Sequence, residues 1–229
     1  MELSSLSEQH SFFSNGFLIQ DPSPVILLVF PSFVYISINY QQCKAIMHFN
    51  KVFLTGFMTS GKSTLGPILA NVLGWNFYDL DKVIEKEEKK AVVDIFKERG
   101  EEYFRRRETS VLERLVTENN IIVALGGGTI ANQVNLDLLK NNGKLIYLKV
   151  APEVLYQRLK HKIDRPLFRD LVLSENPKDD FIKRINKLLN EREKYYSQAD
   201  IVIDCDSRRV GITVDQLAHQ LNRMKHEKN

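Results

Sequence analysis

The chain has 229 residues, of which 43% are hydrophobic and 27% are charged, a composition typical of globular proteins rather than disordered ones. A formal net charge of +3 is too small to indicate nucleic-acid binding by itself. Two cysteines, Cys43 and Cys205, exclude a disulfide framework and a cysteine-rich zinc site, so we expect a reduced, cytoplasmic protein.

Residues 1–46 differ from the rest of the chain. The apolar run at 24–38 is shorter than the roughly 20 residues that span a bilayer and contains Pro31, so stable membrane insertion is not expected. No basic residue precedes it, which excludes an ordinary secretory signal. We predict an N-terminal extension outside the fold. Three alternatives stay open: an upstream start before Met47, a targeting or membrane-associating segment, and an extra strand on the domain.

Residues 47–229 alternate strand and helix patterns and contain no linker long enough to divide them. Short apolar runs predict strands at 51–55, 76–79, 121–124, 144–150 and 201–204. Helical spacing predicts helices at 62–73, 101–117, 134–140, 152–160, 178–195 and 214–224. Asp81 and Asp94 are candidate caps of two further helices. This alternation predicts an α/β domain with a parallel sheet and helices on both faces.

A phosphate-binding loop follows the first of these strands. Residues 56–63, GFMTSGKS, fit the pattern G-x-x-x-x-G-K-[ST] between a strand and a helix. Glycines let backbone N–H groups approach an anion, and the helix N-terminus favours negative charge. Lys62 can reach the β- and γ-phosphates, and the Ser63 hydroxyl can bind Mg²⁺. The pattern predicts a nucleoside triphosphate site. The N-K-x-D element that a GTPase needs is absent from the sequence. The size of the chain favours a small kinase.

Four further motifs are candidates for the acceptor side. Asp79 and Asp81 follow the second strand, at the sheet edge where ligands bind in open α/β folds; capping by Asp81 alone is the alternative. Arg105 lies in an FRRRE segment that could equally be a solvated face. Glycines 126–128 follow the third strand, either as a close approach to a ligand or as a plain turn. An RPL segment at 165–167 and an R-x-x-x-Y segment at 192–196 complete the set.

Together these motifs resemble the shikimate kinase family in order and spacing. The matching segments are GFMTSGKST, FYDLD, FR with a Glu three residues after the Arg, LGGGT, RPL and R-x-x-x-Y-x-x-A-D, and they cover about residues 49–205. The resemblance implies a three-layer P-loop kinase fold with a five-stranded parallel sheet of order 2-3-1-4-5. It also implies transfer of a phosphoryl group from ATP to the 3-hydroxyl of shikimate, and a lid at about 161–177.

On the nucleotide side, the resemblance implies that Lys62 contacts ATP, that Ser63 binds Mg²⁺, and that Asp79 holds the same ion through water. Arg165 matches the lid arginine that closes on the phosphates. Arg208 and Arg209 are both candidates for the arginine beside adenine, and we favour Arg209. The predicted ATP-binding residues are Gly56, Thr59, Ser60, Gly61, Lys62, Ser63, Thr64, Arg165 and Arg209.

On the acceptor side, Asp81 matches the acid that contacts the shikimate hydroxyls, and Arg105 and Arg192 match the arginines that bind its carboxylate. Gly126, Gly127 and Gly128 match the backbone platform beneath the ring. A planar carboxylate suits bidentate arginine donors, and Asp81 can orient the attacking hydroxyl and take its proton. The predicted catalytic residues are therefore Asp81, Lys62 and Arg165.

Two other functions remain as alternatives. A related small-molecule kinase, for instance one acting on gluconate, would share the phosphate loop but not the two arginine motifs. A non-catalytic relative that only binds these ligands would be expected to lack Lys62 or Asp81, and both are present. We expect ATP and shikimate as the partners, no nucleic acid, and a monomer.

Overall fold

The computed structural model describes residues 25–29, 35–39, 49–160, 168, 170–171, 176–206 and 209–226. The chain divides into two units, Met1–His48 and Phe49–Asn229. In the first unit, strands β1 (Val25–Val29) and β2 (Tyr35–Asn39) pair antiparallel in a sheet of their own. The assignment of residues 1–46 as an extension outside the kinase fold stays a prediction.

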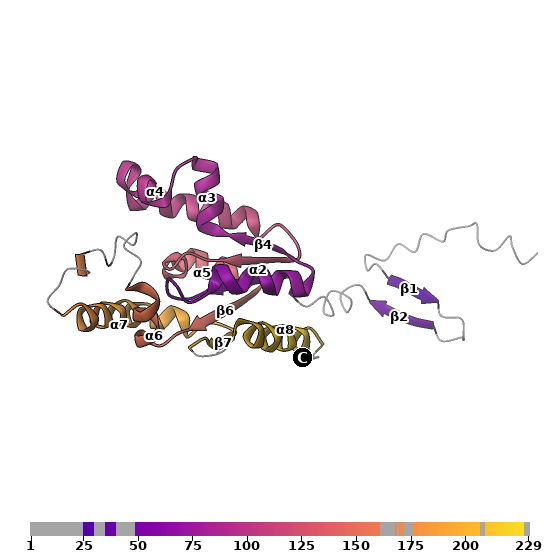
Figure 1. The fold of residues 1–229 in the computed structure, drawn as a ribbon. Helices are drawn as coiled ribbons and strands as arrows, with labels where there is room; N and C mark the ends of the chain where they lie inside the picture. Colours follow the sequence, from indigo (N-terminus) through magenta and orange to yellow (C-terminus); the bar gives the residue numbers. More distant parts are fainter. Residues whose placement is uncertain are drawn as a thin grey trace, which may run out of the picture. The chain divides into compact units, whose positions relative to one another are not determined.

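The second unit is built on a five-stranded parallel sheet (Figure 1). Its strands are β3 (Lys51–Thr55), β4 (Asn76–Asp79), β5 (Ile121–Ala124), β6 (Lys144–Lys149) and β7 (Ile201–Asp204). The spatial order is β4-β5-β3-β6-β7, which confirms the predicted 2-3-1-4-5 arrangement. Only the end of β6 differs, one residue earlier than the sequence predicted.

The apolar side chains of the central strands point alternately to the two faces of the sheet. In β3, Phe53 packs into one hydrophobic cluster while Val52 and Leu54 pack into another, and all three are fully buried. Successive strand side chains point to opposite faces, so an uninterrupted apolar run can be buried on both. This explains why a run as short as KVFLT forms the centre of the domain.

Helices cover both faces, as predicted. The clusters place α2 and α8 on one face and α3, α4, α5 and α7 on the other. The helix bounds are α2 (Lys62–Leu73), α3 (Leu80–Glu88), α4 (Val92–Leu115), α5 (Gln133–Asn142), α6 (Pro152–Leu159), α7 (Pro177–Tyr196) and α8 (Val210–His226), and a short 3₁₀ turn, η2, spans Thr129–Ala131.

Both predicted aspartate caps are wrong. The cap of α3 is Asp79, whose Oδ1 accepts a hydrogen bond from the Lys82 N–H at 3.3 Å, so Asp81 lies inside the first turn. The cap of α4 is Ala91, which offers no side-chain acceptor, and Asp94 lies within the helix. Gly100, directly before the helix predicted at 101–117, has a φ of 81° and a ψ of 170° that interrupt α4. Because Asp81 does not cap the helix, its carboxylate can contact a ligand.

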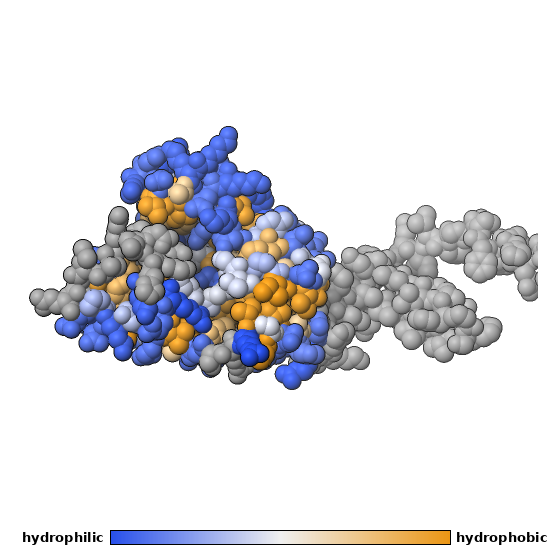
Figure 2. Space-filling view, viewed as in Figure 1, coloured by the Kyte–Doolittle hydropathy of each residue, from blue (hydrophilic) through white to orange (hydrophobic). Residues whose placement is uncertain are grey.

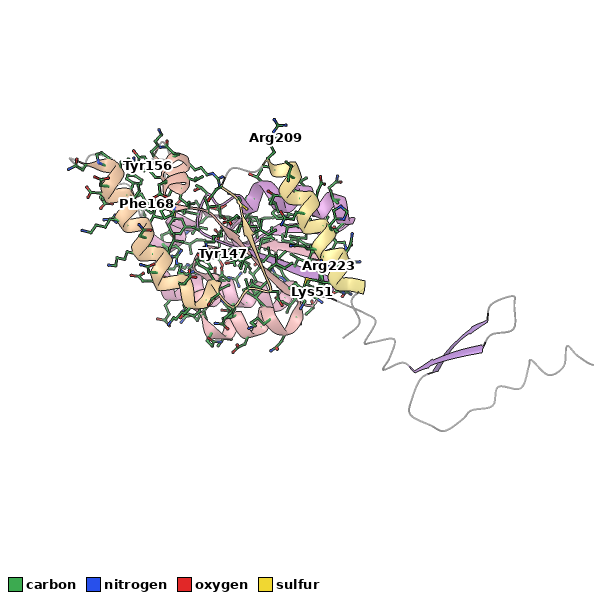
Figure 3. All side chains as sticks on the ribbon, turned by 90° about the horizontal axis from the view of Figure 1, so that it is seen from below. Lys51, Tyr147, Tyr156, Phe168, Arg209 and Arg223 are labelled. Atoms are coloured by element: carbon green, nitrogen blue, oxygen red, sulfur yellow. The ribbon has the colours of Figure 1, made fainter. Side chains whose placement is uncertain are left out.

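A third hydrophobic cluster lies below the phosphate loop. Phe57 of that loop contacts Phe168 edge-on at 6.3 Å between ring centroids, and Phe168 stacks on Phe181 of α7 at 5.2 Å. Figure 3 shows Phe168 and Tyr156 beside α7, where the Tyr156 ring also meets Phe181. These contacts fix one end of the phosphate loop against α6 and α7.

The surface of the second unit is largely polar in the view of Figure 2, especially over α3 and α4. An apolar area lies over α2, whose Ile68 and Val72 are 42% and 52% exposed. Within the described ranges, every helix is too short or too polar to cross a membrane.

Candidate active site

The phosphate loop joins β3 to α2, as the sequence predicted, and two of its glycines adopt backbone conformations that side chains disfavour. Gly56 has a φ of 148°, and a Cβ there would lie 2.7 Å from the Leu148 carbonyl oxygen. Gly61 has a φ of 109° and caps α2. These conformations turn the loop around the start of α2, where unpaired N–H groups favour an anion.

The side chains of the loop and of the first turn of α2 offer several hydrogen-bond donors. The Lys62 ammonium donates to the carbonyl oxygens of Gly56 at 2.8 Å and Phe57 at 3.0 Å, so it lies over the loop. The hydroxyl oxygens of Thr59 and Ser60 are buried and have no hydrogen-bond partner in the described part of the chain. Thr64 is exposed in the first turn of α2. A phosphate group would supply acceptors for these donors.

The two predicted metal residues are in contact. The Ser63 hydroxyl donates to Oδ2 of Asp79 at 2.8 Å, although 16 residues separate them in the chain. Both offer oxygen atoms, the ligand type that Mg²⁺ prefers. The described residues hold no cluster of three or more His, Cys, Asp or Glu side chains suited to a metal. The pair suits an ion that takes most of its remaining ligands from phosphates and water.

Asp81 lies in the first turn of α3, close to Gly126. Burial raises its pKa to about 6, and the negative charges of Glu108 and Asp79 act in the same direction, while Lys62 opposes them. Because this pKa lies below 7, the carboxylate is largely ionised at neutral pH. Its raised basicity suits a group that accepts a proton from a hydroxyl.

Arg105 is held by two glutamates on its own helix. Its guanidinium pairs with Glu101 at 3.0 Å and with Glu108 at 3.0 Å. Glu108 has no exposed surface, and its other oxygen accepts a hydrogen bond from the Thr129 hydroxyl. A buried carboxylate must be paired, so Glu108 fixes the guanidinium while about a third of the Arg105 side chain, 32%, stays exposed to a ligand.

Arg192 presents a buried donor. Its Nη1 has no hydrogen-bond partner within the described ranges, and its guanidinium lies 5.9 Å from the Phe57 ring centroid. One helical turn later, Tyr196 is fully buried. Burial raises the pKa of its phenol, and the positive charge of Arg192 opposes that rise. An unsatisfied buried cationic donor is costly unless an anion can reach it.

The three consecutive glycines bring these residues together. A Cβ at Gly126 would lie 2.9 Å from Oε1 of Glu108 and 3.0 Å from Oδ1 of Asp81. One at Gly127 would lie 3.3 Å from Nη1 of Arg192, and one at Gly128 2.8 Å from Nη2 of Arg105. Each glycine therefore faces a different predicted acceptor residue, and any side chain would intrude between the backbone and these groups.

The comparisons with known proteins agree with this geometry. The family model described as "Shikimate kinase" matches residues 58–222. The chain belongs to the shikimate kinase family. The shikimate kinase of Chlorobium phaeobacteroides (strain BS1) is 41% identical over 184 residues, which cover 80% of this chain and 92% of that protein. That of Chloroherpeton thalassium is 44% identical over 172 residues, covering 75% and 92% respectively.

Solved shikimate kinases share the fold. The enzyme from Acinetobacter baumannii, in complex with shikimate, matches with a TM-score of 0.70 and 31% identity over 80% of this chain and 99% of that one. The enzyme from Bacteroides thetaiotaomicron matches with a TM-score of 0.68 and 33% identity, covering 75% and 98%. The predicted three-layer P-loop kinase fold is thereby confirmed.

Two residues of this shikimate kinase site were not assigned by the sequence analysis. Glu108 belongs to a motif of the sequence, but only the structure shows that it is buried and contacts both Arg105 and Thr129. Arg158 of α6 donates to the carbonyl oxygens of Thr59 at 3.2 Å and Cys205 at 2.8 Å, tying the phosphate loop to the segment after β7. No local motif marks Arg158, because its partners are 99 and 47 residues away.

Of the remaining predicted nucleotide residues, only Arg209 belongs to the described part of the chain. Arg165 and Arg208 fall outside the described residues, as does most of the predicted lid at 161–177. Arg209 is exposed, directly before α8, and Figure 3 shows its side chain pointing away from the sheet. Their roles stay predictions.

Proposed function

We propose that this chain transfers the γ-phosphoryl group of ATP to the 3-hydroxyl of shikimate. The observation that carries the proposal is the glycine triplet at 126–128, which faces Asp81, Arg192 and Arg105 in turn. A hydroxyl-orienting carboxylate and two cationic groups around a bare backbone surface match a small acid with hydroxyl groups. Membership of the shikimate kinase family, including a relative solved with shikimate, supports this choice.

Arg105 and Arg192 bind the shikimate carboxylate in this proposal. Guanidinium groups offer paired donors that match a planar carboxylate, and they come here from two different helices. Their separate anchors, Glu108 for Arg105 and the Phe57 ring for Arg192, keep the donors in place before substrate binds. Prior ordering of this kind lowers the entropic cost of binding.

Asp81 orients the 3-hydroxyl and accepts its proton as the phosphoryl group is transferred. Phosphoryl transfer depends mainly on alignment and on neutralising negative charge. Lys62 supplies positive charge over the phosphate loop, and we propose the same role for Arg165. The attractive force of Lys62 also helps to keep Asp81 ionised.

We propose that Ser63 binds Mg²⁺ directly and that Asp79 holds it through water. When bound, the ion would neutralise charge on the β- and γ-phosphates. Gly56, Thr59, Ser60, Gly61 and Thr64 complete the phosphate side, and Arg209 the adenine side, of the proposed nucleotide site. The residues at 161–177 would act as the lid that excludes water.

A coupled assay of ADP release tests the function. Shikimate should stimulate turnover, whereas gluconate at the same concentration should not. Arg105→Lys should raise the shikimate KM by about tenfold or more, since an ammonium cannot reproduce the paired donors. Arg106→Lys is the matched control, because Arg106 is exposed and forms an ion pair with Glu102 on the surface of the same helix. Absence of shikimate-dependent turnover would refute the proposal.

We further propose a cytoplasmic monomer whose kinase domain is residues 47–229. The presence of only two cysteines, typical of reduced proteins, motivates the location. The separate sheet formed by β1 and β2 supports an extension that is distinct from the kinase domain. A protein beginning at Met47 should elute as a monomer on size-exclusion chromatography with unchanged turnover; loss of folding would contradict the domain boundary.

A further inference from the structure

A chain of buried polar groups runs beneath the glycine triplet. Glu108 of α4, Thr129 of η2 and Asn135 of α5 each have no exposed surface. They come from three different elements, and burying polar groups is costly unless each finds partners. The mechanism proposed above uses none of Thr109, Thr129 or Asn135.

The hydrogen bonds connect these groups in series. The Asn135 amide donates through Nδ2 to the backbone carbonyl oxygen of Thr129 at 3.2 Å. Its Oδ1 accepts from the Thr109 hydroxyl at 2.8 Å, and that hydroxyl also lies 3.1 Å from the carbonyl oxygen of Arg105. On the other side, the Thr129 hydroxyl donates to Glu108, which pairs with the Arg105 guanidinium at 3.0 Å.

The orientation of the Asn135 amide follows from its partners. A backbone carbonyl oxygen only accepts hydrogen bonds, so Nδ2 must face Thr129. Oδ1 must then face Thr109, whose hydroxyl can donate. Leucine has a similar volume but could make neither bond, so this position demands an amide rather than merely a side chain that fills space.

Both ends of the series adjoin residues of the proposed acceptor site. Thr129 directly follows Gly128, and Thr109 lies one helical turn after Arg105 on α4. The gap between Gly128 and Arg105 is narrow, because a Cβ at Gly128 would lie 2.8 Å from Nη2 of Arg105. A small shift of α4 against the glycine loop would change this gap directly.

We propose that Asn135 is a positioning residue that sets the separation between Arg105 and the glycine platform. The inference rests on the proposed function, since it assumes that Arg105 and Gly128 bind shikimate. Asn135 is too deeply buried to touch substrate, and it acts through Thr129 on one side and Thr109 on the other. Its influence should therefore fall on the acceptor and not on ATP.

Asn135→Leu tests the proposal in the full chain by steady-state kinetics. We expect the shikimate KM to rise about tenfold and the ATP KM to stay within about twofold, because small misplacements of binding groups are costly. Asn142→Leu is the matched control on the same helix. The Asn142 amide donates to the carbonyl oxygen of Leu138 within α5, so both KM values should stay unchanged.

Thr109 provides a second test if Asn135→Leu fails to fold. Thr109→Val removes the hydroxyl and should raise the shikimate KM, whereas Thr109→Ser keeps the hydroxyl and should restore it. The double variant with Asn135→Leu should be no worse than the more affected single variant, because both changes break one series. An unchanged shikimate KM, or an equal rise in both KM values, would overturn the inference. Failure of the unsubstituted enzyme to use shikimate would instead refute the proposed function.

Discussion

Asp81 is expected to lower the stability of the domain in exchange for reactivity. Its pKa rises from 3.8 to about 6 on folding, a difference of roughly two units, and each unit corresponds to about 1.4 kcal/mol. The folded state favours the protonated form of Asp81. Below pH 3.8 the carboxyl is protonated in both states and the domain has its full stability; that stability falls as the pH rises through about 6. Allowing for partial solvent contact, the ionised carboxylate costs about 2 kcal/mol at pH 8.

Asp81→Asn removes this charge at every pH. Urea unfolding at pH 8 should show a midpoint about 1 M higher than that of the unsubstituted protein, given a typical slope of about 2 kcal/mol per molar. The gain should shrink as the pH falls toward 4, while shikimate turnover should drop by about 10²-fold or more at neutral pH. Asp94→Asn, an exposed carboxylate in the first turn of α4, is the control and should give no such gain. Equal or lower stability of Asp81→Asn at pH 8 would refute the reasoning.

Three further outcomes are expected. Lys62→Ala should lower kcat by about 10²-fold or more, with an unchanged circular-dichroism melting curve; normal kcat would exclude a role for its ammonium. The kcat/KM for shikimate should fall about tenfold per pH unit below pH 6, where Asp81 becomes protonated; a flat profile down to pH 5 would contradict its role as base. Gly66→Ala should cost about 1–3 kcal/mol in urea unfolding, because its Cβ would lie 2.2 Å from the Phe77 ring; a gain in stability, as is usual for this change in helices, would contradict the packing.

Much of the fold could be predicted because the signals are local. Most strands of the large sheet are short, mainly apolar runs that end close to glycine or a polar residue, as in KVFLT before Gly56. The glycine at position 100 marks the break in α4, which its φ of 81° explains. The phosphate loop is equally local, since its backbone path depends on Gly56 and Gly61.

Other features depend on contacts that no local pattern specifies. Asp79 and Asp81 can both cap a helix, and only the observed bond from Lys82 N–H to Asp79 decides between them. In the sequence, Glu108 is one of many charged residues on α4. In the structure it is buried, and it is paired there with the Thr129 hydroxyl and the Arg105 guanidinium. The motifs therefore predicted the candidate acceptor residues, whereas only pairings between residues far apart in the chain show how those residues meet.

A structure of the enzyme with shikimate and a non-hydrolysable ATP analogue would test the central claim most directly. The account predicts the carboxylate between Arg105 and Arg192, the ring over residues 126–128, and the 3-hydroxyl within hydrogen-bond distance of Asp81 and facing the terminal phosphate. A carboxylate bound away from both arginines, or a 3-hydroxyl turned away from Asp81, would contradict it.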